Sequence, residues 1–435
     1  MAFCIACACF REQSKSLRLK LLQGRGELRL AVVSPFLDRQ HGTELCIIEQ
    51  IERFAIKYQW TIELYSQEVS QLRGVVSSSG ASAKSLNSIL WHKVSNIPGP
   101  HLLKYLWWFV ANHWHRWRDR RSGRVRPDLV YSPGINCLDA DVIVVHIVFH
   151  AFHAQVRSEL ALRRVPFRSW LRLIHRKLYY KLIMFLELAV YSDPSVRLVA
   201  VSSLVAAQLK AHFQRDDVSV IPNAVDTLRF TPDARKERRV AARQSFLFIQ
   251  HDFVLLLIGN DWKKKGLDTL LRALVLLGDL PLRLLVVGGD DPDLYRPLLG
   301  DLALQDRVRF ERPSPEVLSF YAAADVYVGP SLEDAFNLPI LEAMACGLPV
   351  IASARAGASE NISHGETGLL LHDPKNWHEL AELIRLLFTD ENLRHKISDL
   401  GSRHARTHCT WDQNAEQTRK LLQETLSVRR LRKLS

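Results

Sequence analysis

The chain has 435 residues, of which 47% are hydrophobic and 24% are charged. This length exceeds what one hydrophobic core usually serves, so it predicts a globular protein of two domains with about 200 residues each. A net charge of +12 indicates an anionic partner, and the lack of any run of roughly 18 apolar residues excludes an integral membrane protein.

The cysteine pattern favours reduced thiols. There are seven cysteines, an odd number, and no second Cys/His pair accompanies Cys4 and Cys7 as a zinc site would require. We therefore expect a cytoplasmic protein. Residues 1–27 are an unassigned leader, because their apolar segment lacks the preceding basic residues of a signal peptide.

The first predicted unit is a strand, a turn and a helix. The run LRLAVVSPF from Leu28 is a buried strand, and the loop DRQHGTE leads from it into a helix over Glu44–Tyr58. A strand that turns through Gly42 and Thr43 into a helix places backbone N–H groups where a phosphate can bind.

Five further strands are expected before residue 223: Thr61–Ser66, Asp128–Ser132, Val142–His146, Arg197–Ser202 and Val218–Pro222. Their alternation with helical or loop segments predicts a parallel sheet that binds its ligand at the carboxyl ends of the strands. His146 lies at such an end, where it either faces the ligand or has a structural role. With His150 and His153 it has the spacing of a metal-ligand set, but no carboxylate or cysteine follows closely, so we expect no metal.

A basic window extends from residue 101 to residue 181, with 15 Lys and Arg against 5 Asp and Glu. Its second half predicts a helix after Pro166, with arginines on one side and five apolar residues on another: Trp170, Leu171, Ile174, Leu178 and Leu182. Such a helix suits an anionic membrane surface, which would make the protein peripheral on the inner face of the membrane. A partly buried helix with snorkelling arginines is the alternative. Single-stranded nucleic acid is the least favoured partner, because no nucleic-acid module is recognisable.

A second doubly wound sheet is predicted from Asn223 onward, because strands again alternate with helices. The strands are expected at Val254–Gly259, Arg283–Gly288 and Val308–Phe310, and the helices at Leu267–Leu277, Asp293–Leu302, Trp377–Phe388 and Thr407–Leu426.

The loop NDWKKKG joins the first of these strands to its helix and contains Asn260, Lys263, Lys264 and Lys265. Lysines at a strand-to-helix loop can bind a diphosphate and stabilise a leaving group without a metal. A charged surface loop is the alternative.

A strand, a loop, a helix and a strand follow one another between Ala324 and Glu360. The helix N-terminus near Leu338 is a site for an anion. Asp334 and Glu342 are eight residues apart, which is too wide for a metal dyad on one helical face but suits the two ends of an elongated ligand such as a sugar nucleotide. The alternative is one acidic residue at a helix start and one solvated Glu.

The segment DAFNLPILEAMACGLPVIASARAGASE, residues 334–360, resembles the donor-site signature of retaining glycosyltransferases of family 4, of the type EGFGLPxLEAMACGxPV followed by GGxxE. The resemblance implies that Glu342 binds the ribose hydroxyls and that Asp334 stands where the family's first Glu contacts the hexose. Ala335 and Asn337 replace two glycines of the signature. The resemblance also assigns diphosphate contacts to the backbone N–H groups of Phe336, Asn337 and Leu338, and a further carboxylate to Glu360.

Three other segments resemble the same family. His41-Gly42-Thr43-Glu44 is similar to its GGxE-type turn, and VIPNAVD is similar to its IPNGVD linker. Lys265 matches a family Lys, whereas Asn260 occupies an Arg position, so a second cation would come from Lys263 or Lys264.

The resemblance implies an α/β protein of the GT-B fold, with two Rossmann-like domains facing across a cleft. We expect them at residues 28–222, on the acceptor side, and 223–406, on the donor side, with the C-terminal helix of 407–435 crossing back to the first. The implied reaction moves a hexosyl unit from a nucleotide diphosphate sugar to an acceptor hydroxyl, with retention, without a metal and without an evident nucleophile. Lys265, Asp334 and His146 are the expected catalytic residues.

The expected acceptor is a glycan or a lipid-linked group in cell-envelope, glycolipid or polysaccharide synthesis. Two alternatives remain from the residues. The departures at Asp334, Ala335, Asn337 and Asn260 would also fit a non-catalytic relative that binds a nucleotide sugar or a membrane, and a sugar-nucleotide epimerase would share the architecture.

Overall fold

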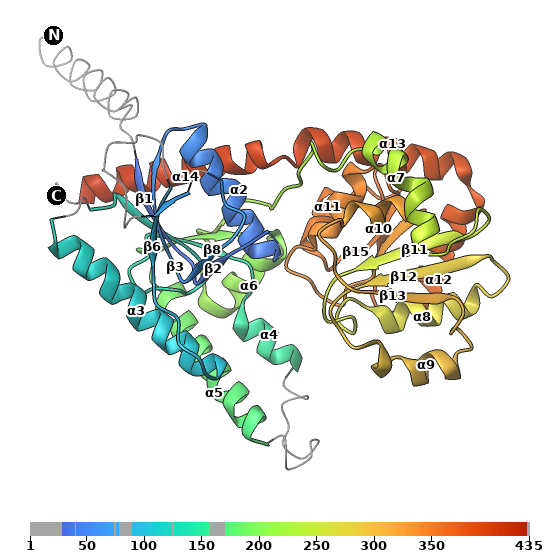
Figure 1. Cartoon of the computed structure of the whole chain (residues 1–435), viewed down its shortest axis with the longest axis horizontal. Coiled ribbons are helices and arrows are strands. Elements are labelled where there is room, and N and C mark those ends of the chain that lie inside the picture. The colour runs from blue at the N-terminus through green and yellow to red at the C-terminus, as the bar shows by residue number, and fades with distance from the viewer. Residues whose placement is uncertain are drawn as a thin grey trace, which may run out of the picture.

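The computed structural model describes residues 28–39, 41–73, 75–77, 89–123, 126–156 and 170–432. It contains two separate parallel sheets, each covered by helices and each the centre of one domain (Figure 1). The predicted α/β architecture with two Rossmann-like domains is therefore confirmed.

The first domain is built on an eight-stranded sheet in the order β10-β9-β8-β7-β1-β3-β6-β5, in which every pair is parallel. Its strands are β1 (Arg29–Val33), β3 (Thr61–Ser66), β5 (Val75–Ser77), β6 (Ile89–Lys93), β7 (Leu129–Pro133), β8 (Val142–Val145), β9 (Arg197–Ala200) and β10 (Ser219–Val220). Its helices are α2 (Gly42–Ile56), α3 (His101–Arg121), α4 (Phe149–Val156), α5 (Trp170–Tyr191) and α6 (Ser203–Phe213), and a small second sheet pairs β2 (Phe36–Leu37) with β4 (Glu68–Val69).

The second domain has a six-stranded parallel sheet in the order β13-β12-β11-β14-β15-β16. The strands are β11 (Phe253–Ile258), β12 (Leu282–Val287), β13 (Val308–Glu311), β14 (Val326–Gly329), β15 (Val350–Ser353) and β16 (Leu369–Leu371). The helices are α7 (Pro232–Ser245), α8 (Leu267–Leu276), η3 (Pro292–Leu294), α9 (Arg296–Asp301), α10 (Leu318–Ala323), α11 (Leu338–Ala345), η4 (Gly357–Asn361), α12 (Trp377–Thr389), α13 (Glu391–His408) and α14 (Trp411–Arg432). The central strands read as continuous apolar runs because helices cover both faces of the sheet.

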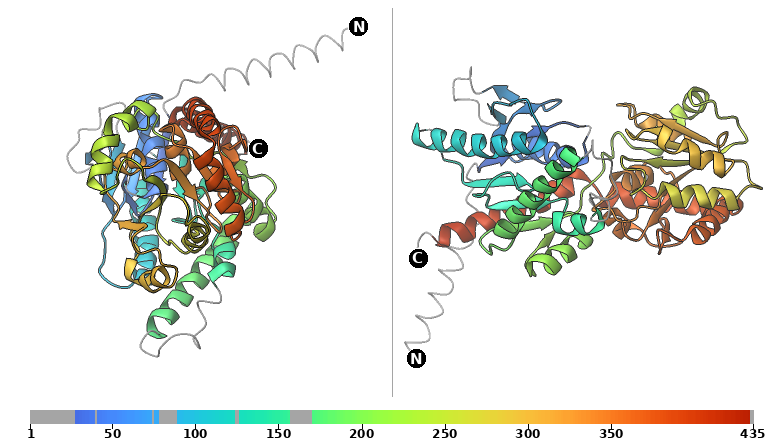
Figure 2. Two further views of the ribbon diagram at one scale, coloured as in Figure 1. Left: turned by 90° about the vertical axis from the view of Figure 1, so that its right-hand side faces the viewer. Right: turned by 90° about the horizontal axis from the view of Figure 1, so that it is seen from below.

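Helix α14 leaves the second domain and runs along the first, on the side of α2 (Figures 1 and 2). The Gln50 amide donates to the Asn414 side-chain oxygen over 2.8 Å. Farther along the helix, the Arg429 guanidinium lies 2.5 Å from the Asp141 carboxylate. These contacts extend along α14 and join the two domains through one long helix.

The structure corrects two helix predictions. The helix expected over Thr407–Leu426 does not begin at Thr407, because α13 continues to His408 and a short break at Cys409–Thr410 precedes α14. The helix expected over Asp293–Leu302 is interrupted between η3 and α9.

Helix α7 is attached to the second domain mainly through hydrogen bonds of its arginines, so it needs no regular apolar stripe. Its Thr231 N-cap accepts a hydrogen bond from the Ala234 N–H over 3.1 Å. Arg235, on the inner side of the helix, donates to the carbonyl oxygens of Tyr321 and Ala324 over 3.1 and 2.8 Å. A hydrophobic pattern therefore could not reveal this helix, which the sequence analysis does not predict.

Within the described part of the chain, every helix is too short or too polar to cross a membrane.

Candidate functional site

A cavity of about 710 Å³ lies between the two domains. Ten of the thirteen predicted site residues line it, three from the first domain and seven from the second: Gly42, Thr43, His146, Asn260, Lys265, Asp334, Phe336, Asn337, Leu338 and Glu342. Lys263, Lys264 and Glu360 lie outside the lining. The site predicted from separate segments of the sequence is therefore largely one place in the structure.

The N-termini of two helices meet at this cavity. Helix α2 begins at Gly42, and a Cβ atom placed there would lie 3.2 Å from the Leu338 Cδ1 atom at the start of α11. The first N–H groups of a helix have no partner within the helix, and they carry its positive dipole end. Their convergence from both domains creates a place suited to an anionic ligand.

Asn337 gives α11 the backbone turn that a glycine would otherwise supply. It has a left-handed conformation, with φ of 69°, directly before the helix. Asn adopts this region more readily than most residues. Its amide donates to the Ser331 hydroxyl over 3.3 Å and accepts from the Tyr327 hydroxyl over 3.3 Å. The replacement of a signature glycine by Asn337 therefore preserves the turn.

Lys265 and Asp334 form an ion pair inside the cavity, with 2.5 Å between the Lys265 Nζ atom and the Asp334 Oδ2 atom. Both side chains are largely buried, and the other Asp334 oxygen accepts from the Phe336 N–H over 3.2 Å. The Lys265 stem lies against Gly259, where an added Cβ atom would come within 2.6 Å of its Cε atom. Asp334 therefore occupies the Lys265 ammonium and the Phe336 N–H group, both of which the resemblance assigns to a diphosphate. An anionic ligand would compete with Asp334 for these two groups.

Gly266 fixes the turn that directs Lys265 into the cavity, and we expect Gly266→Ala to lower the free energy of unfolding by about 2–4 kcal/mol. Its φ is +81°, and an added Cβ atom would lie 2.0 Å from the Pro330 carbonyl oxygen. Gly365 is a matched control because its φ is +78° but no atom lies within 4 Å of an added Cβ atom. Urea denaturation of Gly365→Ala should show only the backbone penalty, about 1 kcal/mol. Equal losses in both variants would contradict the steric argument.

A further cation of the cavity is Arg229, which the sequence analysis missed. Arg229 lines the cavity and donates to the Pro315 carbonyl oxygen over 2.5 Å. Lys264 instead pairs with Asp261 over 2.6 Å and lies 4.3 Å from the ring centre of Phe152 in the first domain. Asn260 accepts a hydrogen bond from the Gly289 N–H over 2.8 Å. The linker VIPNAVDTLRF carries Arg229 only six residues beyond Asn223, but no local pattern indicates where its side chain points.

Glu342 lies one turn into α11, at the cavity wall. The Tyr321 hydroxyl donates to its Oε2 atom over 2.6 Å. Burial raises the pKa of Glu342 above its ordinary value, although the Tyr321 hydrogen bond and the Arg229 charge act in the opposite direction. Tyr321 therefore fixes one carboxylate oxygen of Glu342 while the residue forms part of the cavity lining.

His146 follows β8 and contributes to the cavity from the first domain. Its Nε2 atom is buried and has no hydrogen-bond partner among the described residues. Burial lowers the pKa of His146 to about 4, so the imidazole is neutral near pH 7. An unpartnered polar atom at the lining is a place for a ligand hydroxyl. His150, by contrast, is paired with the buried Glu187 over 2.6 Å.

The lowered pKa of His146 predicts that stability falls on acidification. Since the folded-state pKa is about 4 and the ordinary value is 6.5, the unfolded state binds a proton first as the pH falls. We expect this group alone to lower the free energy of unfolding by about 2 kcal/mol between pH 7 and pH 5. Urea denaturation should show a smaller decline for His146→Gln than for the wild type. Parallel declines would contradict the assignment.

Glu360 connects the domains instead of lining the cavity. It accepts hydrogen bonds from the N–H group of Ser203, over 2.8 Å, and from the Ser203 hydroxyl, over 3.0 Å. Next to this contact, the Ser202 hydroxyl donates to the Ala335 carbonyl oxygen over 2.7 Å. Gly357 permits the approach, because an added Cβ atom would lie 2.2 Å from that same oxygen. The loop around Asp334 is thus held against the start of α6.

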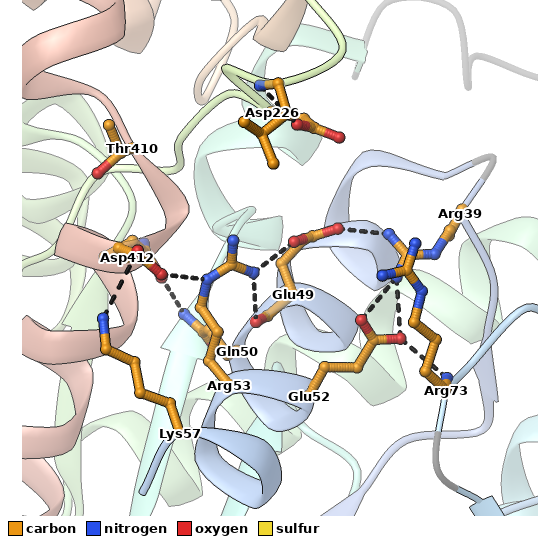
Figure 3. A network of polar contacts seen from close by, with 12 residues as sticks. Arg39, Glu49, Gln50, Glu52, Arg53, Lys57, Arg73, Asp226, Thr410 and Asp412 are labelled. Atoms are coloured by element: carbon orange, nitrogen blue, oxygen red, sulfur yellow. Dashed lines mark hydrogen bonds and ion pairs between the residues drawn. The ribbon is translucent and has the colours of Figure 1, made fainter.

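A polar network around α2 borders the cavity (Figure 3). The Arg39 guanidinium contacts Glu49 and Glu52 on α2, and the Glu49 carboxylate also accepts from Arg53 over 2.5 Å. The Arg53 guanidinium also forms an ion pair with Asp412 on α14, with 2.8 Å between the Arg53 Nε atom and the Asp412 Oδ1 atom. Because Arg39 and Glu49 both line the cavity, the network links its first-domain wall to the helix that crosses between the domains.

Among the described residues, no three His, Cys, Asp or Glu side chains gather as they would around a metal ion. The positive groups at the cavity are instead Lys265, Arg229, Arg39 and the two helix N-termini.

Comparison with known proteins agrees with this arrangement. Residues 239–404 match the family model described as Glycosyl transferases group 1. The chain is 36% identical, over 205 residues, to D-inositol 3-phosphate glycosyltransferase of Pseudarthrobacter chlorophenolicus, and the alignment covers 44% of this chain and 48% of the relative. The chain spans about half the length of the curated relatives it matches.

Two solved structures share the whole architecture. WaaG, a glycosyltransferase involved in lipopolysaccharide biosynthesis, has a TM-score of 0.68 at 20% identity, covering 89% of this chain and 98% of WaaG. The Anabaena protein HepE in complex with UDP-glucose has a TM-score of 0.65 at 18% identity, covering 91% of this chain and 100% of HepE. At these identities the similarity establishes the fold, which is GT-B, and the family match lies within the second half of the chain.

Proposed function

We propose that the chain is a retaining glycosyltransferase that moves a hexosyl unit from a nucleotide diphosphate sugar to an acceptor hydroxyl. The observation that carries the proposal is the convergence of Lys265, Glu342 and the N-termini of α2 and α11 on one cavity between the domains. Its volume of about 710 Å³ lies within the usual range for a small-molecule site. The cavity offers cationic and N–H groups for a diphosphate and a carboxylate for hydroxyl groups.

In this proposal the diphosphate lies at the two helix N-termini and replaces Asp334 as the ion-pair partner of Lys265. Lys265 then stabilises the negative charge that develops on the departing diphosphate. Arg229 supplies the second positive charge, so the charge on the leaving group is met without a metal. Glu342, fixed by Tyr321, accepts hydrogen bonds from the ribose hydroxyls.

The hexose lies toward the first domain, where the neutral His146 Nε2 atom can form a hydrogen bond with a sugar hydroxyl. Asp334, once separated from Lys265, is free to accept a hydrogen bond from the same sugar. We assign no side chain as a nucleophile. The rate would come from holding donor and acceptor in line and from stabilising the charge on the leaving group.

We further propose that the acceptor is a glycan or a lipid-linked group of the cell envelope. The reaction would take place in the cytoplasm, with a cytoplasmic nucleotide sugar as the donor. WaaG, named for lipopolysaccharide biosynthesis, supports this class of acceptor, whereas the relatives named D-inositol 3-phosphate glycosyltransferase favour a small phosphorylated polyol in its place. The acceptor would approach from the first domain, because the second domain contributes most of the cavity lining assigned to the donor.

The test is a thermal-shift screen of the full chain against UDP-, GDP- and ADP-sugars without added metal, followed by a transfer assay. A ligand at 100 times its Kd should stabilise the folded state by about 2.7 kcal/mol. UDP-glucose is the first donor to try. A stabilisation by one nucleotide class that Glu342→Ala abolishes supports the donor site, and no stabilisation by any donor overturns the proposal.

A second candidate is a non-catalytic relative that binds a nucleotide sugar. The observation that favours it is the Lys265–Asp334 ion pair, which uses the cation that the leaving group requires. This candidate predicts donor binding without transfer or hydrolysis, and an increase in turnover when Asp334→Glu and Asn337→Gly are combined. Transfer by the wild-type chain would exclude it.

A further inference from the structure

Helix α3 has a continuous row of exposed apolar side chains. They recur at spacings of three and four residues, and Val110 is 64% exposed: Leu103, Trp107, Val110, Trp114 and Trp117. Residues at these spacings share one face of a helix. Large apolar side chains in such a row, three of them tryptophans, are not the scattered exposure normal for a soluble protein.

Helix α5 repeats this pattern. Its exposed apolar side chains follow spacings of four, four, seven and three residues, and Phe185 is 67% exposed: Trp170, Ile174, Leu178, Phe185 and Leu188. Lys181 is exposed in the gap between Leu178 and Phe185 and therefore lies on the same face. Of the five apolar residues that the sequence analysis placed on one side of this helix, Trp170, Ile174 and Leu178 are exposed. Leu182 is instead half-buried against the core, and the Leu171 side chain lies outside the described residues.

The two rows form one surface. Helices α3 and α5 lie side by side, with 3.1 Å between the Leu102 N atom and the His175 Nε2 atom and 5.8 Å between the ring centres of Tyr105 and Tyr179 (Figure 1). On each helix these contacts lie between the buried face and the exposed row. Both rows consequently point away from the sheet, and we call their combined surface the α3/α5 face.

The charges of the α3/α5 face are all positive. The single carboxylate of each helix is buried: Asp119 accepts from the Tyr65 hydroxyl over 3.2 Å, and Glu187 accepts from the Phe149 N–H over 2.6 Å. Arg118 and Arg121 remain at the surface, 5.2 Å from the ring centre of Trp114 and 4.4 Å from that of Trp117. An exposed apolar surface with cations at its edge and no exposed carboxylate suits an anionic partner.

We propose that the α3/α5 face binds the surface of a membrane that contains anionic lipids. Trp side chains are favoured at the boundary between headgroups and acyl chains, and exposed Leu, Val and Phe can enter the acyl region below it. Arg118, Arg121 and Lys181 would meet the lipid phosphates. A second copy of the chain fits less well, because two such faces would bring positive charges together.

This inference goes beyond the transfer reaction and is independent of it. The face belongs to the first domain, which the proposed function assigns to the acceptor, so a chain bound in this way would present that domain to the membrane. Binding can be measured without any nucleotide sugar, and its failure would leave the proposed transfer untouched.

The test is sedimentation of the full chain with vesicles of phosphatidylcholine, with or without phosphatidylglycerol. We expect binding to the anionic vesicles, weaker binding to pure phosphatidylcholine, and release at high salt because the charges are exposed. Trp114→Ala combined with Trp117→Ala should weaken the partition coefficient by about tenfold or more. Arg118→Glu combined with Arg121→Glu should have an effect of similar size, about tenfold.

Matched controls come from the second domain. Leu247 and Leu294 are 79% and 76% exposed, and their replacement by Ala removes apolar surface elsewhere. Lys236→Glu combined with Arg238→Glu reverses two exposed charges on α7. These variants should bind as the wild type does, and thermal unfolding should confirm that all variants are folded.

Two outcomes would overturn the proposal. One is equal sedimentation of the wild type with and without phosphatidylglycerol, or of the wild type and the α3/α5 variants. The other is concentration-dependent self-association of the wild type in light scattering that the Trp variant loses, which would assign the face to a second copy of the chain.

Discussion

Lys265→Ala is expected to lower kcat by about 10²–10³-fold, because it removes the cation that meets the charge developing on the diphosphate. The Lys265 ammonium is the group closest to Asp334 in the cavity, at 2.5 Å, and its stem is held against Gly259. In the proposal Lys265 exchanges Asp334 for the diphosphate on donor binding, so its charge is in place when the bond to the sugar breaks. Steady-state transfer kinetics with the donor found in the screen measure the effect.

Lys264→Ala is the matched control for this prediction. Lys264 is the preceding residue in the same loop, but it pairs with Asp261 and lies over Phe152, outside the cavity lining. We expect its replacement to change kcat by less than about tenfold, which is 1.4 kcal/mol in the barrier. Similar losses in both variants would indicate that the loop acts through its overall charge or its fold, and would contradict the assignment of Lys265 as the catalytic cation.

The second large effect is expected at Glu342, where replacement by Gln should raise the donor Kd by roughly 10–100-fold. The estimate takes about 1.5–3 kcal/mol for hydrogen bonds that involve a charged group. Gln keeps the shape of the side chain and can still contact Tyr321, so the change removes mainly the negative charge. Isothermal titration with the donor measures the Kd directly, and the free nucleoside diphosphate should lose affinity by a similar factor because the proposed contact is to the ribose.

Glu333→Gln is the control for Glu342. Glu333 adjoins Asp334 but accepts a hydrogen bond from Gln208 of the first domain over 2.7 Å, and it does not line the cavity. Its replacement should leave the donor Kd within about twofold, because no lost charge faces the ligand. Tyr321→Phe removes the hydroxyl that fixes Glu342, so its donor Kd should lie between those of Glu333→Gln and Glu342→Gln. A donor Kd that Glu342→Gln leaves unchanged would show that the ribose lies elsewhere.

Much of the fold could be predicted from local patterns. Parallel strands buried on both faces are continuous apolar runs, so β1, β8, β11 and β14 were recognisable without any knowledge of their neighbours. Elements held by polar contacts were not. Helix α7 is fixed by arginines that reach backbone carbonyls, and α3 carries apolar side chains on both its buried and its exposed face, so the sequence shows no single apolar side.

The residues of the candidate site that could be predicted are those in the connections between a strand and the following helix. Gly42, Lys265 and Leu338 belong to strand-to-helix connections, and in parallel α/β domains such connections all emerge at the carboxyl edge of the sheet. Their order in the sequence therefore fixed their neighbourhood in space. Glu342, one turn into α11, followed from the same helix start.

The sequence could not predict the direction of side chains whose partners are remote in sequence, and only the tertiary structure shows it. Lys263, Lys264 and Lys265 are adjacent in the chain, yet of these only Lys265 lines the cavity, because Gly266 and Pro330 fix the turn beside it. Glu360 contacts Ser203, and Asp334 contacts Lys265, at sequence separations of 157 and 69 residues.

The sequence by itself thus determined the two sheets, the sheet edge at which the cavity lies and ten of the residues that line it. The tertiary structure decided which charged groups face the cavity, which join the domains, and that α3 and α5 expose their apolar rows together. Backbone direction and burial follow from short-range periodicity, whereas the choice of partner for a long charged or aromatic side chain depends on what the packing of distant elements places within its reach.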